Sequence, residues 1–130
     1  MSGFERSVEA MTNSTIVQQF FDSYTRALLG RDSKAIAEHY AVPALIEFPE
    51  HPIAVSEASQ TEQFFSGAFG QYEAVSTTHA TIKVVAETGH SIWADVTWTH
   101  DAGVPSEHFI YQLVRDSESW KIAVLTPLDT

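Results

Sequence analysis

The sequence predicts an α+β domain in which helices pack on one face of an antiparallel sheet. In the first half of the chain, apolar residues recur at spacings of three and four, as they do in amphipathic helices. From about Ser76 onward, apolar and polar residues alternate instead, which is typical of strands with one buried face. Helices that precede a run of consecutive strands indicate an α+β architecture.

The size and composition of the chain fit one globular domain. Its 130 residues suit a single core, and 44% of them are hydrophobic while 18% are charged. We expect residues 1–12 to form a polar arm and residues 13–130 to form the domain. A net charge of −10 argues against nucleic acid or an anionic membrane as a partner. The sequence has no cysteine, no apolar leader and no long apolar run, so we expect a cytoplasmic protein.

The clearest helix is predicted in STIVQQFFDSYTRALLGRD, which starts at Ser14. Asn13 or Ser14 can cap the start of this helix, and Gly30 can end it. Its apolar residues lie on one stripe, which we expect to face the sheet; they are Ile16, Val17, Phe20, Phe21, Tyr24, Ala27 and Leu28.

A second, short helix is predicted in SKAIAEHYA, residues 33–41. Asp32 or Ser33 can cap its start, and Pro43 is expected to close it because proline cannot continue a helix. The stretch ALIEF that follows, residues 44–48, reads as a strand.

A third helix is predicted after His51, which lies between Pro49 and Pro52. Ser59 and Glu62 have the spacing of a capping box, although Ser56 could start the helix one turn earlier. The inner face of this helix is aromatic and carries Phe64, Phe65, Ala68, Phe69 and Tyr72.

Four successive strands are predicted in the second half of the chain, at residues 78–89, 90–100, 106–116 and 119–127. In the second strand, every second residue from Ile92 to His100 lies on the more apolar face, and we expect this face to contact the helices. Glu107 and Phe109 then belong to the same face of the third strand.

The predicted register places His100 opposite Glu107. This pairing also places Trp98 opposite Phe109, so apolar side chains meet across the two strands. A shift by one residue would place Trp98 opposite His108 and mix polar with apolar side chains. Three interpretations of His100 and Glu107 then stay open. They are an acid–base pair at the end of an apolar face, a salt bridge at the end of a hairpin, or two groups that reach water where the sheet flares.

Two stretches, YTRALLGRDSKAIAEHYA and SEHFIYQLVRDSESWKIAVL, resemble the nuclear transport factor 2-like superfamily, most closely its SnoaL-like and ketosteroid isomerase-like branches. The resemblance spans roughly residues 15–127. It implies a cystatin-like conical barrel, in which three N-terminal helices pack on a curved, mostly antiparallel sheet around an apolar pocket. It also implies a homodimer formed through the outer face of the sheet.

The resemblance can be carried to three positions of the ketosteroid isomerase site. Tyr24 matches the tyrosine that donates a hydrogen bond to the substrate oxygen. Glu107, just before a His-Phe pair, matches a carboxylic acid that is kept protonated in an apolar site. The position of the general base on the first strand is Phe48, which cannot abstract a proton, and Glu47 should point to the opposite face. SnoaL-like cyclases also use an acidic residue and a histidine, which keeps His100 and Glu107 as candidates.

These residues define the candidate site. We expect Tyr24, His100 and Glu107 to be catalytic, and we expect eight residues to line the pocket, although the same residues could fill an ordinary core: Phe20, Phe48, His51, Phe64, Phe69, Trp98, Phe109 and Tyr111.

The outer face of the sheet is expected to form the dimer interface. Trp93 and Trp120 supply large side chains there, and Asp95 on this face would be an interface residue. Asp101 and His108 lack the spacing of metal ligands, so no metal site is predicted.

The expected function is that of a small-molecule-binding SnoaL-like domain. Its ligand would be compact, apolar or aromatic, and oxygenated. The domain could be an acid–base isomerase, cyclase or dehydratase, and no cofactor is implied. The alternative is a non-catalytic ligand-binding or dimeric partner domain, which the missing base at Phe48 favours.

Overall fold

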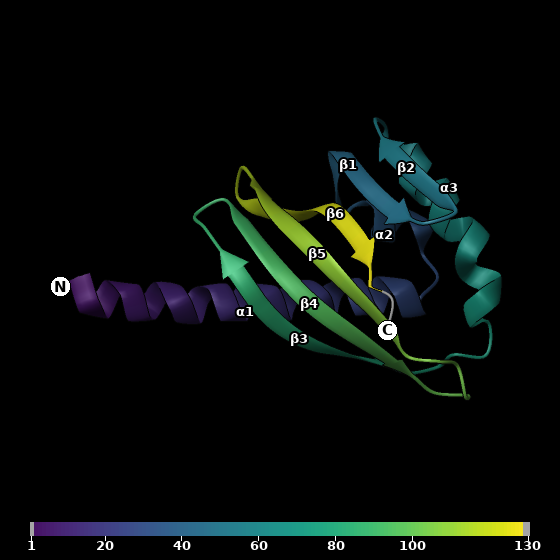
Figure 1. The fold of residues 1–130 in the computed structure, drawn as a ribbon, viewed down its shortest axis with the longest axis horizontal. Helices are drawn as coiled ribbons and strands as arrows, with labels where there is room; N and C mark the ends of the chain where they lie inside the picture. The colour runs from purple at the N-terminus through teal and green to yellow at the C-terminus, as the bar shows by residue number, and fades with distance from the viewer. Residues whose placement is uncertain (1, 129–130) are drawn as a thin grey trace.

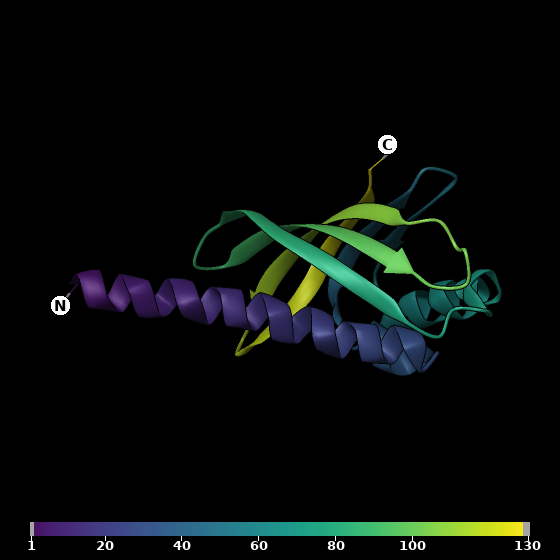
Figure 2. The same cartoon turned by 90° about the horizontal axis from the view of Figure 1, so that it is seen from below.

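A long helix lies along one face of a curved sheet in the computed structural model, which describes the backbone of residues 2–128 and the side chains of residues 14–128 (Figure 2). The helical elements are α1 (Ser2–Leu29), α2 (Ser33–Ala37), α3 (Ala58–Ala68) and the 3-10 helix η1 (Phe69–Tyr72) (Figure 1). This arrangement confirms the predicted α+β class. Within the described residues, no helix is both long and apolar enough to cross a membrane.

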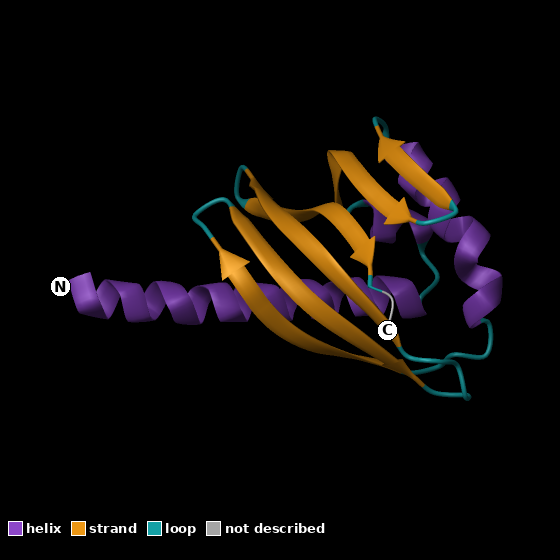
Figure 3. Cartoon of the chain, viewed as in Figure 1, coloured by secondary structure: helices purple, strands orange, loops and turns teal. Residues whose placement is uncertain are grey.

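One six-stranded sheet contains all the strands of residues 2–128 (Figure 3). They are β1 (Tyr40–Phe48), β2 (His51–Val55), β3 (Thr78–Glu87), β4 (Ser91–His100), β5 (Glu107–Asp116) and β6 (Ser119–Pro127). The spatial order is β2-β1-β6-β5-β4-β3, with β1 parallel to β6 and all other neighbours antiparallel. The four-stranded meander predicted from residue 78 onward is confirmed.

The start of α1 differs from the prediction. The helix begins at Ser2 and not at Asn13 or Ser14, so residues 2–12 are helical, and the N-terminal turns of α1 extend beyond the sheet (Figure 1).

The end of α1 is a Schellman motif in which Arg31 takes the place usual for glycine. The N–H of Arg31 donates to the carbonyl of Leu28 at 3.1 Å, and the N–H of Asp32 donates to that of Ala27 at 3.2 Å. Arg31 has a φ of 50°, in the left-handed region. Gly30 therefore follows the helix as predicted, but Arg31 makes the turn.

The segment after α1 contains more strand than predicted. Asp32 caps α2 as expected, because its side chain accepts a hydrogen bond from the N–H of Ala35 at 3.1 Å. The helix ends at Ala37, and Tyr40 already pairs with Ile122 of β6. Pro43 consequently lies inside β1 and does not close the helix.

The hairpin formed by β1 and β2 was not predicted. His51 pairs with Phe48, and Pro52 lies in β2, which is the edge strand of the sheet. Proline is tolerated on an edge strand, where its missing N–H removes no bond from the interior of the sheet. The two prolines around His51 therefore bracket a hairpin turn and do not interrupt the strands.

The capping residues of α3 also differ from the prediction. Gln60 accepts hydrogen bonds through Oε1 from the N–H groups of Ser56 and Glu57, at 2.6 and 2.9 Å. Glu57 is the N-cap, two residues before Ser59 and one residue after Ser56, so the helix starts close to the earlier of the two predicted positions.

The core lies between α1 and the face of the sheet predicted to be inner. Ile92, Ala94, Val96 and Trp98 alternate with more exposed residues and are at most 2% exposed. Phe21 of α1 packs against this face, with its ring centroid 6.2 Å from that of Trp98.

The register between β4 and β5 is shifted by two residues from the prediction. Trp98 pairs with Glu107 and Val96 pairs with Phe109. A shift by two residues keeps every side chain on its predicted face, so the alternating pattern could not distinguish the two registers. His100 lies beyond this ladder and pairs with Thr78 of β3 instead.

The position of Trp120 also corrects the prediction. Trp120 lies two residues from the buried Ile122 in β6 and packs against the core cluster, so it does not join Trp93 on the outer face. The ladder between β5 and β6 has a bulge, because Leu113 pairs with Ile122 whereas Gln112 pairs with Val124. The bulge interrupts the strict alternation of inner and outer side chains along β6, which makes the face of Trp120 hard to predict from the sequence.

Candidate functional site

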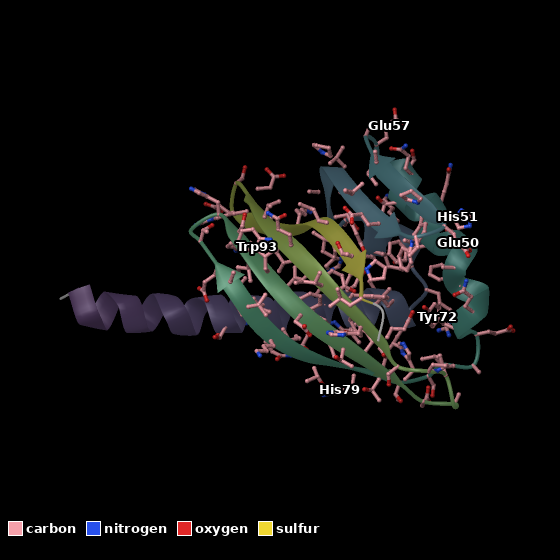
Figure 4. All side chains as sticks on the ribbon, in the orientation of Figure 1. Glu50, His51, Glu57, Tyr72, His79 and Trp93 are labelled. Atoms are coloured by element: carbon pink, nitrogen blue, oxygen red, sulfur yellow. The ribbon has the colours of Figure 1, made fainter. Side chains whose placement is uncertain are left out.

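A pocket of about 660 Å³ opens at the end of the sheet where α3, η1 and the C-terminal end of α1 converge on it. This volume falls within the range of small-molecule sites. Figure 4 places Tyr72 of η1 and the tip of the β1–β2 hairpin, with Glu50 and His51, at the same end of the molecule, away from Trp93.

Most of the predicted site residues line this pocket. Those that do so are Tyr24, Phe48, His51, Phe64, Phe69, Trp98, His100, Glu107, Phe109 and Tyr111. Phe20 does not, because its ring packs edge-on against His39 at 5.4 Å, between α1 and the segment after α2. The prediction of Phe20 as a pocket residue is therefore wrong.

The polar wall of the pocket centres on Glu107. Its Oε1 lies 2.9 Å from Nε2 of His100, and its Oε2 accepts a hydrogen bond of 2.7 Å from the hydroxyl of Tyr72. The His100 side chain is 8% exposed and that of Glu107 is 28% exposed. The two groups are therefore paired in the pocket wall, and Glu107 is the partner that a ligand can reach.

Thr78 completes a chain of four polar side chains. Its Oγ1 lies 2.7 Å from Nδ1 of His100, so both ring nitrogens of this histidine have a partner. If Glu107 is ionised and accepts from Nε2–H, a neutral His100 accepts at Nδ1 from the threonine hydroxyl. The carboxylate oxygens keep further lone pairs that can accept a proton from a ligand.

Sequence reasoning missed the roles of Tyr72 and Thr78. The sequence predicts Tyr72 on the apolar inner face of a helix, but Tyr72 lies in η1, and its hydroxyl contacts Glu107 at the start of β5. Burial raises the pKa of the Tyr72 phenol, and its hydrogen bond to Glu107 raises it further, so it remains a donor. No pattern in the sequence linked Tyr72 to Glu107.

Tyr24 lies deep in the pocket with a partner of its own. Its hydroxyl is 2.7 Å from that of Tyr40, and Tyr24 is 1% exposed. Burial raises the pKa of Tyr24 well above its ordinary value, and the neighbouring Tyr40 adds to the rise. If Tyr40 donates within this pair, Tyr24 can donate its own proton into the pocket.

Phe48 occupies the wall where the resemblance placed a general base. Its ring lies 5.3 Å from that of Phe64 and 5.8 Å from that of Phe109, so this wall is apolar. Glu47 is exposed, as expected for the opposite face of β1. His51 lines the pocket and is itself exposed.

A second histidine–carboxylate pair lies on the outer face. Nε2 of His108 is 2.7 Å from Oδ1 of Asp95, with side chains that are 27% and 31% exposed. His108 thus faces away from Glu107, as predicted. Across the described part of the chain, no three His, Asp or Glu side chains come together as metal ligands could.

Comparisons with known structures show the same fold. A candidate scytalone dehydratase of Novosphingobium aromaticivorans matches with a TM-score of 0.75 and 10% identity, over 95% of this chain and 88% of that one. An NTF2-like protein of unknown function from Shewanella oneidensis matches with a TM-score of 0.74 and 12% identity, over 90% and 99%. Aln2 of a Streptomyces species matches with a TM-score of 0.65 and 20% identity, over 90% of each chain.

Sequence comparison gives the family. No match is found among curated proteins. The family model described as "NTF2-like protein (DUF6841)" matches residues 12–130, which is nearly the whole domain. The chain is therefore a member of this NTF2-like family.

Proposed function

We propose that this protein binds a compact, apolar or aromatic, oxygenated molecule and catalyses a cofactor-independent acid–base reaction on it. The observation that carries the proposal is the chain Thr78–His100–Glu107–Tyr72 on the wall of a mostly apolar pocket. Isomerisation, cyclisation and dehydration all require a positioned acid–base group with little water around it.

Glu107 is the proposed proton-transfer group. Both Glu107 and His100 line the pocket, but the Glu107 side chain is the more exposed of the two, and both ring nitrogens of His100 have partners. His100 and Tyr72 each donate to a different oxygen of Glu107, and this fixes the orientation of the carboxylate. Tyr24, at the floor, is the proposed donor to a ligand oxygen, where it would stabilise developing negative charge.

The side chains that line the pocket favour proton transfer on an apolar ligand. The lining is mainly apolar and rich in aromatic side chains, so it suits an apolar ring system, and proton transfer is the chemistry that its polar groups can perform. The structural similarity to a candidate scytalone dehydratase adds dehydration to the reactions to test.

Proton exchange from a small ketone tests the proposal without the natural substrate. The probe is 2-tetralone, a bicyclic ketone with acidic α-hydrogens, in deuterated buffer, with deuterium uptake followed by NMR. We expect the protein to accelerate exchange over buffer, and we expect Glu107→Gln to remove most of this acceleration. Asp95→Asn, which changes the equivalent pair on the outer face, should leave the rate unchanged.

Binding without exchange would instead support the non-catalytic alternative. Two observations favour that reading: Phe48 replaces the expected base, and the Tyr24 hydroxyl already has Tyr40 as a partner. Binding of 2-tetralone is followed independently of turnover by tryptophan fluorescence, because Trp98 lines the pocket whereas Trp93 and Trp120 do not. If neither binding nor exchange occurs, the proposed ligand class is wrong.

We also propose a homodimer formed through the outer face of the sheet. The support is the half-buried Trp93 on that face, beside the Asp95–His108 pair. Sedimentation of the purified protein and of Trp93→Lys tests this. A wild-type monomer, or a variant that remains fully dimeric, would contradict this interface.

A further inference from the structure

Arg31 connects the end of α1 to the segment that carries Tyr72. One of its terminal nitrogens, Nη1, donates to the carbonyl of Leu29 at 2.9 Å. The other, Nη2, donates to the carbonyls of Tyr72 and Val75, at 2.5 and 3.0 Å. The guanidinium therefore holds the backbone on both sides of one turn, and its donors are directed at backbone carbonyls.

Arg31 has a left-handed backbone conformation, and its side chain donates hydrogen bonds to the backbone of two segments. This residue is the left-handed residue of the Schellman motif, where glycine is favoured because it carries no Cβ. A non-glycine residue persists in this region where its surroundings fix it. The side chain of Arg31 is held by four backbone carbonyls, those of Leu29, Tyr72, Glu73 and Val75.

Tyr72 makes hydrogen bonds through both its backbone carbonyl and its side-chain hydroxyl. Its carbonyl accepts from Arg31, and its hydroxyl donates to Glu107. The segment has a further anchor, because Ser76 donates from its backbone N–H and its hydroxyl to the carboxylate of Asp101. Loss of Arg31 would therefore leave the segment attached through Asp101 and would free mainly the part around Tyr72.

We propose that Arg31 is a positioning residue that sets the Tyr72 hydroxyl against Glu107, and so orients the carboxylate that performs the proton transfer. The consequence for catalysis rests on the proposed function, whereas the effect on the polar chain does not. Arg31 lines the pocket, but its role is exerted through Tyr72 and needs no contact with the ligand.

A double-mutant cycle between Arg31 and Tyr72 tests this role. The variants are Arg31→Met, Tyr72→Phe and the pair, and the signature is the NMR signals of the His100 ring, which contacts Glu107 directly. We expect both single variants to shift these signals in the same direction. In the Tyr72→Phe background, Arg31→Met should add little, because the hydroxyl that Arg31 positions is already gone.

Arg31→Gly separates positioning from stability. Glycine relieves the left-handed backbone, so the melting temperature should fall less than it does in Arg31→Met, while the His100 signals should move as far. Arg31→Lys keeps the charge and one donor group, so it should restore part of the wild-type signal. The proposal would be overturned if the His100 signals of Arg31→Gly stayed at their wild-type positions. It would also be overturned if the shifts of the two single variants added fully in the double variant.

The exchange rate of 2-tetralone then links positioning to catalysis. We expect Arg31→Met and Tyr72→Phe each to lower this rate about tenfold, the scale of one hydrogen bond to a charged group. If the His100 signals move as expected but the wild type does not accelerate exchange, Arg31 positions Tyr72 and the proposed function fails. If exchange falls only in Tyr72→Phe, the proposed function stands and Arg31 has no positioning role.

Discussion

Nε2 of His100 lies 2.9 Å from Oε1 of Glu107, although Glu107 is paired across the sheet with Trp98. The two residues are diagonal neighbours on the inner face, a separation that long side chains can bridge. Asp95 and His108 are diagonal neighbours on the outer face, with Nε2 2.7 Å from Oδ1. The molecule therefore holds two chemically similar pairs that differ in burial.

We predict stronger coupling in the inner pair. A double-mutant cycle with His100→Gln and Glu107→Gln should give an interaction free energy of about 1 kcal/mol, because the His100 side chain is 8% exposed. The outer pair, with both side chains more exposed, should give roughly 0.5 kcal/mol or less. Urea unfolding of the variants at pH 7 measures both values. Equal coupling on the two faces would show that the pocket wall does not shield the inner pair.

Tyr72→Phe should lower the free energy of unfolding by about 1 kcal/mol. The change removes the donor to Oε2 of Glu107 and leaves the ring in place. Tyr40→Phe is a useful comparison, since it also removes one hydroxyl from a tyrosine that bonds another side chain, but in the neutral Tyr24–Tyr40 pair. Because Tyr40→Phe leaves the buried Tyr24 hydroxyl without this partner, its loss can be as large or larger. No measurable loss in Tyr72→Phe would contradict a stabilising bond to Glu107.

His39 should make the free energy of unfolding depend on pH. Burial lowers the pKa of His39 below its ordinary 6.5, so between the two values the unfolded chain binds more protons than the folded one. Stability is therefore expected to fall as the pH drops below about 6.5. His39→Gln should flatten this dependence between pH 7 and pH 5 in urea unfolding.

His79→Gln is the matched control for His39, because His79 is exposed. The control should keep the wild-type slope of stability against pH. If His39→Gln also keeps that slope, the histidine is not desolvated in the folded protein. His39 has two polar partners that glutamine cannot both replace, Ser23 and the carbonyl of Ala35, so some stability should be lost at every pH.

Most of the fold could be predicted from the sequence because its signals are local. The alternation in Ile92 to Trp98 fixes a buried face, and the aromatic stripe around Phe21 fixes the opposing helix face. The register and the β1–β2 hairpin could not be predicted in this way. A two-residue shift preserves the pattern, and the prolines around His51 hide an edge strand.

The site was only partly predictable, for a related reason. His100 and Glu107 share a face in either register, so their contact survives the incorrect pairing. Tyr72 reaches Glu107 from η1, thirty-five positions earlier in the chain, and only tertiary packing brings the two together. Arg31 was missed because its contacts are with backbone carbonyls, which leave no side-chain signature in the sequence.

Asp101 should stabilise the protein above about pH 4 and lose this effect in acid. Hydrogen bonds from the side chain and backbone of Ser76 lower the pKa of Asp101 from 3.8 to about 2. The folded state therefore favours the carboxylate, and the stabilisation disappears as the pH falls from about 4 to about 2. The difference in unfolding free energy between wild type and Asp101→Asn should shrink over this range. Asp116→Asn, at the exposed end of β5, should show no such change.

Thr61→Val should raise the stability of the protein. Thr61 is fully buried in α3, and its Oγ1 has no hydrogen-bond partner among the described residues. Burying a hydroxyl without a partner costs about 1–3 kcal/mol, and valine has nearly the same shape, so we expect a gain of about 1 kcal/mol in urea unfolding. Thr61→Ser keeps the hydroxyl and removes the methyl group, so it should lose stability by a similar amount. A loss of stability in Thr61→Val would mean that the hydroxyl is hydrogen-bonded in solution.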